Sequence, residues 1–200
     1  MIGIINYGMG NVGSIYNMLR KIGANVTICS NFDEVNECKK IILPGVGSYD
    51  NAIEKLKSTD LFECIKSKAL SGAPLLGICL GMQILGTTSK EGKLKGLNLI
   101  PGDVIEFSDN IGLRVPHMGW NIVDFNEKEM GKNLIDQNKF YFVHRYFFIP
   151  KSKAHIAGYT EYGIKFSSFI KKDNIYGVQF HPEKSHKYGM LFLKNFNDMK

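Results

Sequence analysis

One short stretch decides how this chain folds: Leu75-Leu76-Gly77-Ile78-Cys79-Leu80-Gly81-Met82-Gln83. An apolar run typical of a buried strand ends at Ile78, and a helix-like pattern opens directly after Cys79. The spacing G-x-C-x-G matches a nucleophile elbow, in which the glycines let strand and helix approach closely and the free N–H groups of the helix favour a thiolate. The stretch therefore predicts a reactive thiol at the edge of a sheet, or else a buried cysteine that only packs.

Composition bounds the class of protein. The chain has 200 residues, of which 44% are hydrophobic, so one domain spanning residues 1–200 with one sizeable core is expected. No apolar run approaches a membrane span, and residues 1–6 predict a strand instead of a leader peptide. The four cysteines form no C-x-x-C pair, which argues against a metal or redox motif and favours a reducing cytoplasm. The net charge of +6 comes mostly from scattered lysines, which predicts no nucleic-acid partner.

The predicted elements alternate in the first half of the chain. Strands are expected at 2–5, 25–29, 41–43 and 75–78, and helices at 12–22, 49–56 and 61–70. After Gly96 the sequence favours strands at 97–107, 119–125, 140–143, 154–159, 164–170 and 175–180, with one helix at 185–196. We therefore predict an α/β fold, with a mostly parallel central sheet flanked by helices and extra, partly antiparallel strands on the same sheet in the second half.

A glycine motif near the start offers an alternative function. Gly8-Met9-Gly10-Asn11-Val12-Gly13 matches G-x-G-x-x-G between a strand and a helix, and Asp33 or Glu34 lies about 20 residues further on. This pattern would suit a dinucleotide enzyme. However, the acidic residues lie beyond the expected end of the second strand, and the motif leaves the cysteine elbow unexplained. We therefore expect no cofactor.

A thiolate nucleophile needs a base, and the base needs an orienting partner. Among the five histidines, His181 alone follows a buried strand at the expected carboxyl edge of the sheet, where ligand sites of parallel sheets lie. Glu183 is two residues away, across the stiff Pro182. A lone histidine is more often structural. A histidine with a nearby carboxylate, in a chain with a cysteine elbow, favours a general base instead.

The third strand leads into the loop Pro44-Gly45-Val46-Gly47. Glycines at these positions would allow backbone N–H groups to point at a developing oxyanion. An ordinary strand-to-helix turn explains the same residues, and from this loop alone that interpretation is favoured.

Together these motifs resemble the class I glutamine amidotransferases, a family with a Cys-His-Glu triad. The resemblance runs from residue 1 to about residue 196. It rests on P-G-V-G at 44–47, L-G-I-C-L-G-M-Q at 76–83 and Q-F-H-P-E at 179–183, and also on residues 6–11, 115–121 and 141–144. It implies a class I amidotransferase fold and accounts for the early glycine motif as an opening loop.

The resemblance also implies roles for individual residues. Cys79 would attack the side-chain amide of glutamine, His181 would move the proton, and Glu183 would orient the imidazole. The loop formed by Gly45, Val46 and Gly47 would supply the oxyanion hole after a rearrangement, while Gly47, Gln83 and Glu91 would contact the glutamine. From the sequence pattern alone, Gln83 could equally be an ordinary polar residue on a helix. No metal is implied.

The amidotransferase pattern occupies the whole chain, so a separate acceptor-processing subunit is expected. In the family this partner is a (β/α)8 barrel that receives ammonia through an internal channel. Trp120, Tyr141 and His144 fall in segments that resemble the interface region, although an aromatic cluster can as easily be core. Two positions depart from the family: Arg145 stands where a small hydroxyl residue is usual, and Asn6 where aspartate is frequent. Because of Arg145, an alternative function stays open: a related subunit that supplies ammonia to a similar barrel with a different acceptor.

Overall fold

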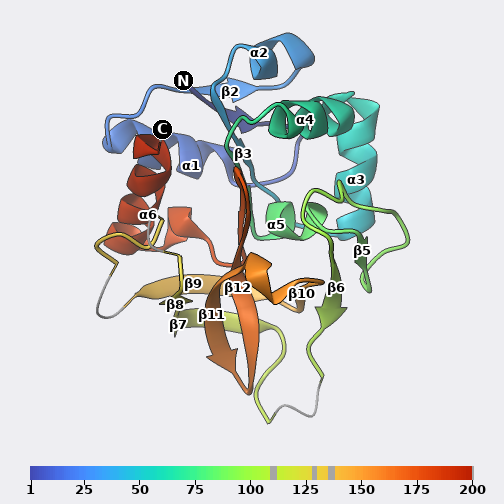
Figure 1. Ribbon diagram of the computed structural model, residues 1–200, viewed down its shortest axis with the longest axis vertical. Helices are drawn as coiled ribbons and strands as arrows, with labels where there is room; N and C mark the ends of the chain where they lie inside the picture. Colours follow the sequence, from blue (N-terminus) through green and yellow to red (C-terminus); the bar gives the residue numbers. More distant parts are fainter. Residues whose placement is uncertain (109–111, 128–129, 135–137, 200) are drawn as a thin grey trace.

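The computed structural model describes residues 1–108, 112–127, 130–134 and 138–199. Its centre is a sheet whose parallel part has the spatial order β2, β1, β3, β4, β13 (Figure 1). These strands are β1 (Ile2–Ile5), β2 (Val26–Cys29), β3 (Lys40–Leu43), β4 (Leu75–Ile78) and β13 (Ile175–Val178). The parallel arrangement confirms the α/β prediction.

Helices cover both faces of this sheet. One face carries α1 (Val12–Lys21) and α6 (His186–Asp198), and the other carries α3 (Tyr49–Ser58) and α4 (Leu61–Leu70) (Figure 1). The strands β1, β4 and β13 are buried along their whole length, as expected for strands covered on both sides. A short helix, α2 (Phe32–Asn36), follows the edge strand β2 and was not expected from the sequence.

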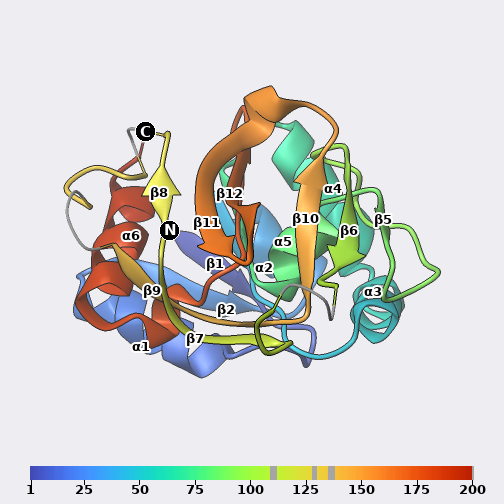
Figure 2. The same ribbon diagram turned by 90° about the horizontal axis from the view of Figure 1, so that it is seen from below.

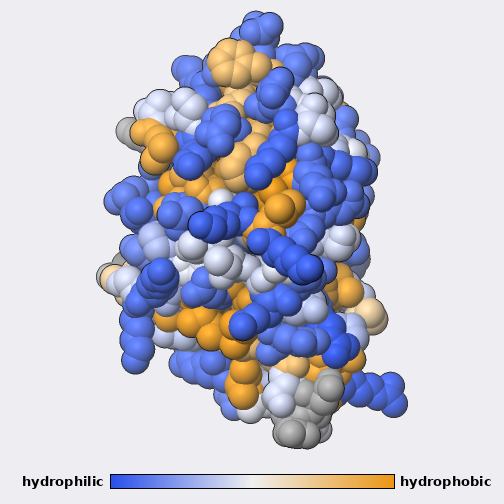
Figure 3. All heavy atoms as spheres, turned by 90° about the vertical axis from the view of Figure 1, so that its right-hand side faces the viewer, coloured by the Kyte–Doolittle hydropathy of each residue, from blue (hydrophilic) through white to orange (hydrophobic). Residues whose placement is uncertain are grey.

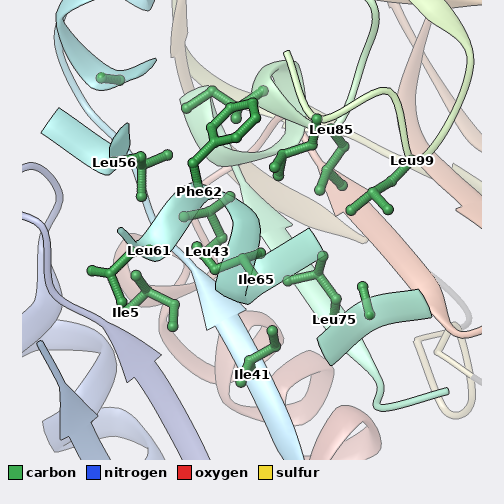
Figure 4. Close-up of a cluster of buried hydrophobic side chains, with 14 of the residues drawn as sticks. Ile5, Ile41, Leu43, Leu56, Leu61, Phe62, Ile65, Leu75, Leu85 and Leu99 are labelled. Carbon is green, nitrogen blue, oxygen red and sulfur yellow. The ribbon is translucent and has the colours of Figure 1, made fainter. Parts of the chain in front are cut away.

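Alternate side chains of the parallel strands enter two separate cores. Ile5, Ile41, Leu43 and Leu75 pack against α3 and α4 (Figure 4). Neighbouring residues of the same strands, such as Ile4, Ile42 and Leu76, join the core under α1 and α6. Each of these side chains is at most 2% exposed, and burial of one stabilises the fold by roughly 2 kcal/mol. The sheet is thereby packed between two helical layers.

The second half of the chain extends the sheet with antiparallel strands. β12 (Ile164–Lys172) pairs with β13 and β11 (Ile156–Tyr162), and β10 (Tyr146–Pro150) connects β12 to β6 (Gly102–Glu106). Two short strands complete this part, β5 (Thr88–Ser89) beside β6 and β8 (Asp124–Phe125) beside β11.

One pair of strands does not join this sheet. β7 (His117–Ile122) and β9 (Lys139–His144) form a separate antiparallel sheet (Figure 2). The expectation that all added strands lie on one sheet was therefore wrong. β9 touches the main sheet through the pairing of Tyr141 with His181, which places it at the carboxyl edge of β13.

The strand expected at 97–107 is shorter than predicted. Only β6 is a strand, because the backbone N–H groups of Leu97 and Leu99 donate to the carbonyl groups of Ile84 and Leu85. These carbonyls lie at the end of α5 (Leu80–Ile84), so the segment caps a helix instead of pairing with a strand.

One side of the outer surface can be compared in hydropathy. The side of the molecule with α3, β5 and β6 is mostly hydrophilic, with smaller apolar patches between charged side chains (Figure 3). Among the described residues, no helix combines the length and the apolar character that crossing a membrane requires.

Candidate active site

The elbow brings Cys79 to the carboxyl edge of the parallel sheet. Its backbone has φ 54° and ψ −108°, in the left-handed half of conformational space that costs energy for a residue with a side chain. A Cβ on Gly81 would lie 1.9 Å from the carbonyl oxygen of Leu43, and one on Gly77 would lie 2.7 Å from the carbonyl oxygen of Gly81. Both positions therefore require glycine, as the spacing predicts.

His181 and Glu183 lie at the same edge, after the neighbouring strand. β13 pairs in parallel with β4, with Val178 opposite Ile78, so the chain leaves both strands side by side. His181 Nδ1 lies 2.8 Å from Glu183 Oε1, and the two side chains are only 2% and 1% exposed. The backbone N–H of His181 donates to Tyr141 O at 2.9 Å, which fixes the turn against β9.

The charges around His181 decide its protonation. Burial alone lowers the pKa of His181, but the charge of the Cys79 thiolate, followed by the Glu183 carboxylate, raises this pKa to about 10. The Nε2 atom of His181 is buried and has no hydrogen-bond partner among the described residues. The structure thus brings thiol, imidazole and carboxylate together and leaves one ring nitrogen available for proton transfer.

A cavity of about 410 Å³ opens beside Cys79. This volume is within the usual range for small-molecule sites. The cavity brings together four of the residues expected to bind glutamine or stabilise an oxyanion, and four further residues complete its wall. The lining residues are Val46, Gly47, Cys79, Leu80, Gln83, Glu91, Arg145 and Tyr146.

Gly45 does not line the cavity and lies behind it. A Cβ at this position would come within 2.9 Å of the Gly81 nitrogen, the Leu80 Cβ and the Tyr7 hydroxyl. Gly45 therefore allows the loop to pack on the elbow, while Val46 and Gly47 face the space beside the sulfur. Gly47 has φ +106°, a conformation that favours glycine.

The early glycine motif supports this same loop. The Tyr7 hydroxyl donates to Pro44 O at 2.9 Å, and a Cβ on Gly10 would lie 2.9 Å from Pro44 Cβ. The last glycine of the motif, Gly13, has no atom near its missing Cβ, whereas a dinucleotide fingerprint uses that glycine for close packing. The motif therefore packs as an opening loop against the segment at 44–47.

Two polar side chains give the cavity its character. Glu91 is half-buried, and burial, together with the nearby Asp50 charge, raises its pKa against an opposing backbone hydrogen bond. Gln83 Nε2 donates to Tyr146 O and to Gln179 Oε1, both at 3.1 Å. The carboxamide oxygen of Gln83 is the atom left to accept a hydrogen bond from a ligand.

Sequence reasoning missed Gln179 as a site residue. Its side chain is fully buried, and its Nε2 lies 3.6 Å from Cys79 Sγ. The available signal was its position two residues before His181, at the end of the strand that leads to the histidine.

Arg145 lies at the wall of the cavity, where its guanidinium forms an ion pair with Glu106. The two side chains are 44% and 43% exposed. The departure from the family at this position therefore places a cation in the exposed part of the cavity wall and not in the buried triad. Asn6, the other departure, donates from its side chain to the Ser30 hydroxyl at 3.3 Å.

The residues expected at an interface separate into two groups. Trp120 is 46% exposed on β7, beside Tyr141 on β9, with ring centroids 6.0 Å apart. His144 lies on the inner side of the same two strands and is only 6% exposed. Its Nε2 is 2.9 Å from Nδ1 of His117, and its Nδ1 donates to Tyr146 O at 2.8 Å. The structure thus does not bring His144 to the outer face.

Comparison with known proteins identifies the family. The family model "Glutamine amidotransferase class-I" matches residues 3–199. The chain is 49% identical over 198 residues to "Imidazole glycerol phosphate synthase subunit HisH 2" of Methanococcus maripaludis, covering 98% of each chain. It is 39% identical over 201 residues to the subunit of the same name from Pseudomonas aeruginosa, covering 100% of both. A third relative, subunit HisH of Moorella thermoacetica, is 42% identical and covers 99% of this chain and 94% of its own.

Solved structures show the same fold at much lower identity. PurLQS from Thermotoga maritima superposes with a TM-score of 0.77 at 16% identity, covering 97% of this chain and 95% of the other. A glutamine amidotransferase gives a TM-score of 0.74 at 14% identity, covering 97% of both chains. The family match over nearly the whole sequence and the shared fold lead to one conclusion: this chain belongs to the class I glutamine amidotransferase family.

Proposed function

We propose that this chain is the glutaminase subunit of an imidazole glycerol phosphate synthase, which releases ammonia from glutamine for histidine biosynthesis. The observation that carries this proposal is the cysteine elbow beside the buried His181–Glu183 pair, with Cys79 lining a cavity of about 410 Å³. Relatives 39–49% identical over nearly their full length, all named as subunits of that synthase, support it.

In the proposed reaction the Cys79 thiolate attacks the side-chain amide carbon of glutamine. The C–N bond breaks, His181 gives a proton to the departing ammonia, and a γ-glutamyl thioester remains on the sulfur. Water then attacks the thioester, His181 accepts its proton, and glutamate leaves as the thiolate reforms. Glu183 holds the imidazole by its Nδ1 atom, so that Nε2 carries the moving proton.

The cavity residues would bind the substrate and its oxyanion. Glu91 suits the α-ammonium group of glutamine because it supplies a carboxylate within the cavity wall. The Gln83 oxygen would accept a hydrogen bond from the substrate. Backbone N–H groups of the loop at 44–47 would stabilise the oxyanion once the loop has rearranged.

The exposed face of β7 and β9 is the proposed docking surface for a (β/α)8-barrel synthase subunit. Met118, Trp120 and Ile122 are 61%, 46% and 53% exposed and point to the same side of β7. The opposite strand contributes Tyr141, whose backbone carbonyl also accepts a hydrogen bond from the N–H group of His181. An exposed apolar face next to the triad suits a partner that must collect ammonia as it forms. Trp120→Ala should weaken partner binding about tenfold or more, as expected for a large aromatic anchor.

A direct test is glutamate release by the purified chain with and without the barrel subunit and its ribonucleotide substrate. Stimulation by the partner is expected, and its absence would argue against this function. Cys79→Ala should abolish glutamate release in the complex. Cys64→Ala, which alters a cysteine of α4 that is only 4% exposed, is the matched control and should retain activity.

A second candidate function is a related subunit that supplies ammonia to a similar barrel with a different acceptor, such as an amidino-sugar of a surface-glycan pathway. Arg145 at the cavity wall favours it, because the family usually has a small hydroxyl residue there. Failure of this chain to rescue a histidine auxotroph, together with stimulation by another barrel, would select this alternative. Under either function we expect one amidotransferase domain over residues 1–200 and a cytoplasmic heterodimer.

A further inference from the structure

We propose that Gln179 is a positioning residue for the nucleophile: its side-chain amide donates a hydrogen bond to Cys79 Sγ and thereby favours the thiolate. The inference deepens the proposed function and rests on the role of Cys79 given there. Gln179 is 0% exposed, and its Nε2 lies 3.6 Å from the sulfur. A buried amide is costly unless its hydrogen bonds are made, and the Gln179 amide makes them to Gln83 and to Cys79.

The neighbouring groups settle which end of the Gln179 amide faces the sulfur. The carbonyl oxygen of Tyr146 can only accept, so the Gln83 atom facing it is the nitrogen. The same Gln83 nitrogen lies 3.1 Å from Gln179, so the Gln179 atom facing Gln83 is the oxygen. The Gln179 nitrogen is then left facing Cys79. The Tyr146 carbonyl therefore determines which end of each amide is the nitrogen, first in Gln83 and then in Gln179.

The Tyr146 carbonyl has a second hydrogen-bond donor besides Gln83. It accepts a second hydrogen bond from Nδ1 of His144, at 2.8 Å. His144 Nε2 accepts from His117, whose remaining ring nitrogen lies 3.2 Å from Asn121 Nδ2. A buried chain of hydrogen bonds therefore runs from β7 through Tyr146 O to the sulfur, and it fixes the Gln83–Gln179 pair in one arrangement.

The chemical effect of the contact differs between the two forms of the cysteine. An N–H group donating to a charged acceptor forms a stronger bond than one donating to a neutral thiol, so the Gln179 amide stabilises the thiolate. His181 and Gln179 thus both support the anion, one by charge and one by a hydrogen bond. Gln179 is absent from the cavity lining, so it acts on the sulfur and not on the substrate.

The test measures the rate of Cys79 alkylation by iodoacetamide as a function of pH, with the modified peptide identified by mass spectrometry. In Gln179→Met, which keeps the chain length but removes the donor, the midpoint of the profile should rise by about one pH unit. The kcat for glutamate release at neutral pH should fall about tenfold, with KM for glutamine unchanged within a factor of about two. Gln179→Glu should raise the midpoint at least as far, because its carboxylate faces the thiolate.

Thr160→Val is the matched control, because it also removes a buried hydrogen bond, that to Ser168 at 2.7 Å, but has no contact with the sulfur. Its alkylation profile should be unchanged. A folded Gln179→Met or Gln179→Glu variant with the parental midpoint would overturn the proposal. If both fail to fold, Gln179→Asn withdraws the amide by one methylene and decides in the same way. Alkylation needs neither glutamine nor a partner, so its result is independent of whether the proposed function holds.

Discussion

Two buried pairs of side chains that contain histidine have opposite electrostatic character. His181 lies against Glu183 after β13, while His117 and His144 face each other across β7 and β9. All three histidines are at most 6% exposed. Yet the pKa of His181 is raised to about 10, against the effect of its own burial, whereas burial lowers the pKa of His117 to about 4 and that of His144 to about 3.

The difference lies in the neighbours and not in the burial. His181 is placed between a thiolate and a carboxylate, and two negative charges outweigh desolvation. At His144 burial lowers the pKa most, and the hydrogen bond to Tyr146 O raises it. The charges of His117 and His181 lower this pKa further. The first pair can therefore move protons, while the second serves as a neutral link in a hydrogen-bonded chain. The comparison separates a reactive histidine from a structural one by charge.

The strongest way to break this comparison is to remove the carboxylate. In Glu183→Gln, kcat for glutamate release should fall about a thousandfold, because general acid–base catalysis by His181 depends on its orientation and charge. The pKa of His181 should also fall, which NMR titration of the ring would measure.

Glu127→Gln is a matched control for that substitution, since it neutralises a carboxylate outside the triad. Glu127 pairs with Lys171, with 3.0 Å between Oε1 and Nζ. The control variant should retain kcat. An unchanged kcat in Glu183→Gln would mean that the imidazole works without its partner and that the comparison fails.

Acid unfolding tests the neutral pair. The folded pKa values of His117 and His144 lie below the ordinary value of about 6.5, so the unfolded chain binds protons first as the pH falls. The stability that they contribute is complete above about pH 6.5 and is lost progressively as the pH falls toward 4 and 3. Between pH 6.5 and 5, each histidine should lower the free energy of unfolding by about 2 kcal/mol, which urea unfolding would measure.

A substitution in the pair should change that slope. His117→Phe removes one titrating group and fits between the rings of Phe142 and Tyr162, whose centroids lie 4.7 and 3.9 Å from that of His117. Its loss of stability on acidification should be smaller, although its stability at pH 7 should also drop. His186→Phe, at an exposed histidine stacked on Trp120, should keep the parental slope. Equal slopes in all three proteins would refute the assignment.

The smallest effect is expected at the exposed ion pair. Arg145 and Glu106 attract each other in high dielectric, with both side chains more than 40% exposed. Arg145→Thr should change the free energy of unfolding by less than about 0.5 kcal/mol. A larger loss, measured by urea unfolding, would show that this exposed pair contributes to stability as a buried pair does.

The sequence predicts the local features of this molecule well. The strands at β1 and β4 match the expected residues because short apolar runs covered on both faces leave a clear signal. The elbow was also predictable, since the need for glycine at 77 and 81 comes from close contacts within one turn and its neighbouring strand. The family fold followed from these motifs.

Features that depend on distant partners were not predictable. β10 was missed because its strand character comes from pairing with β6 and β12, and the separate β7–β9 sheet leaves the same alternating pattern as a strand of the main sheet. The position of Gln179 near His181 does not reveal its contact with Cys79, since the sulfur that it faces is 100 residues away along the chain. His144 was expected at an interface because its segment resembles the interface region of the family, and only its pairing with His117 shows that its side chain faces inward.

The lack of clearance at Gly81 has a consequence for variation of this protein. A library that randomises this codon should return almost nothing but the parent, because even a methyl group would overlap the Leu43 carbonyl. Gly13, which opens onto empty space in α1, should accept many replacements in the same library. Sorting survivors at the two codons would map, without any assay of catalysis, where the backbone itself enforces the shape of the turn.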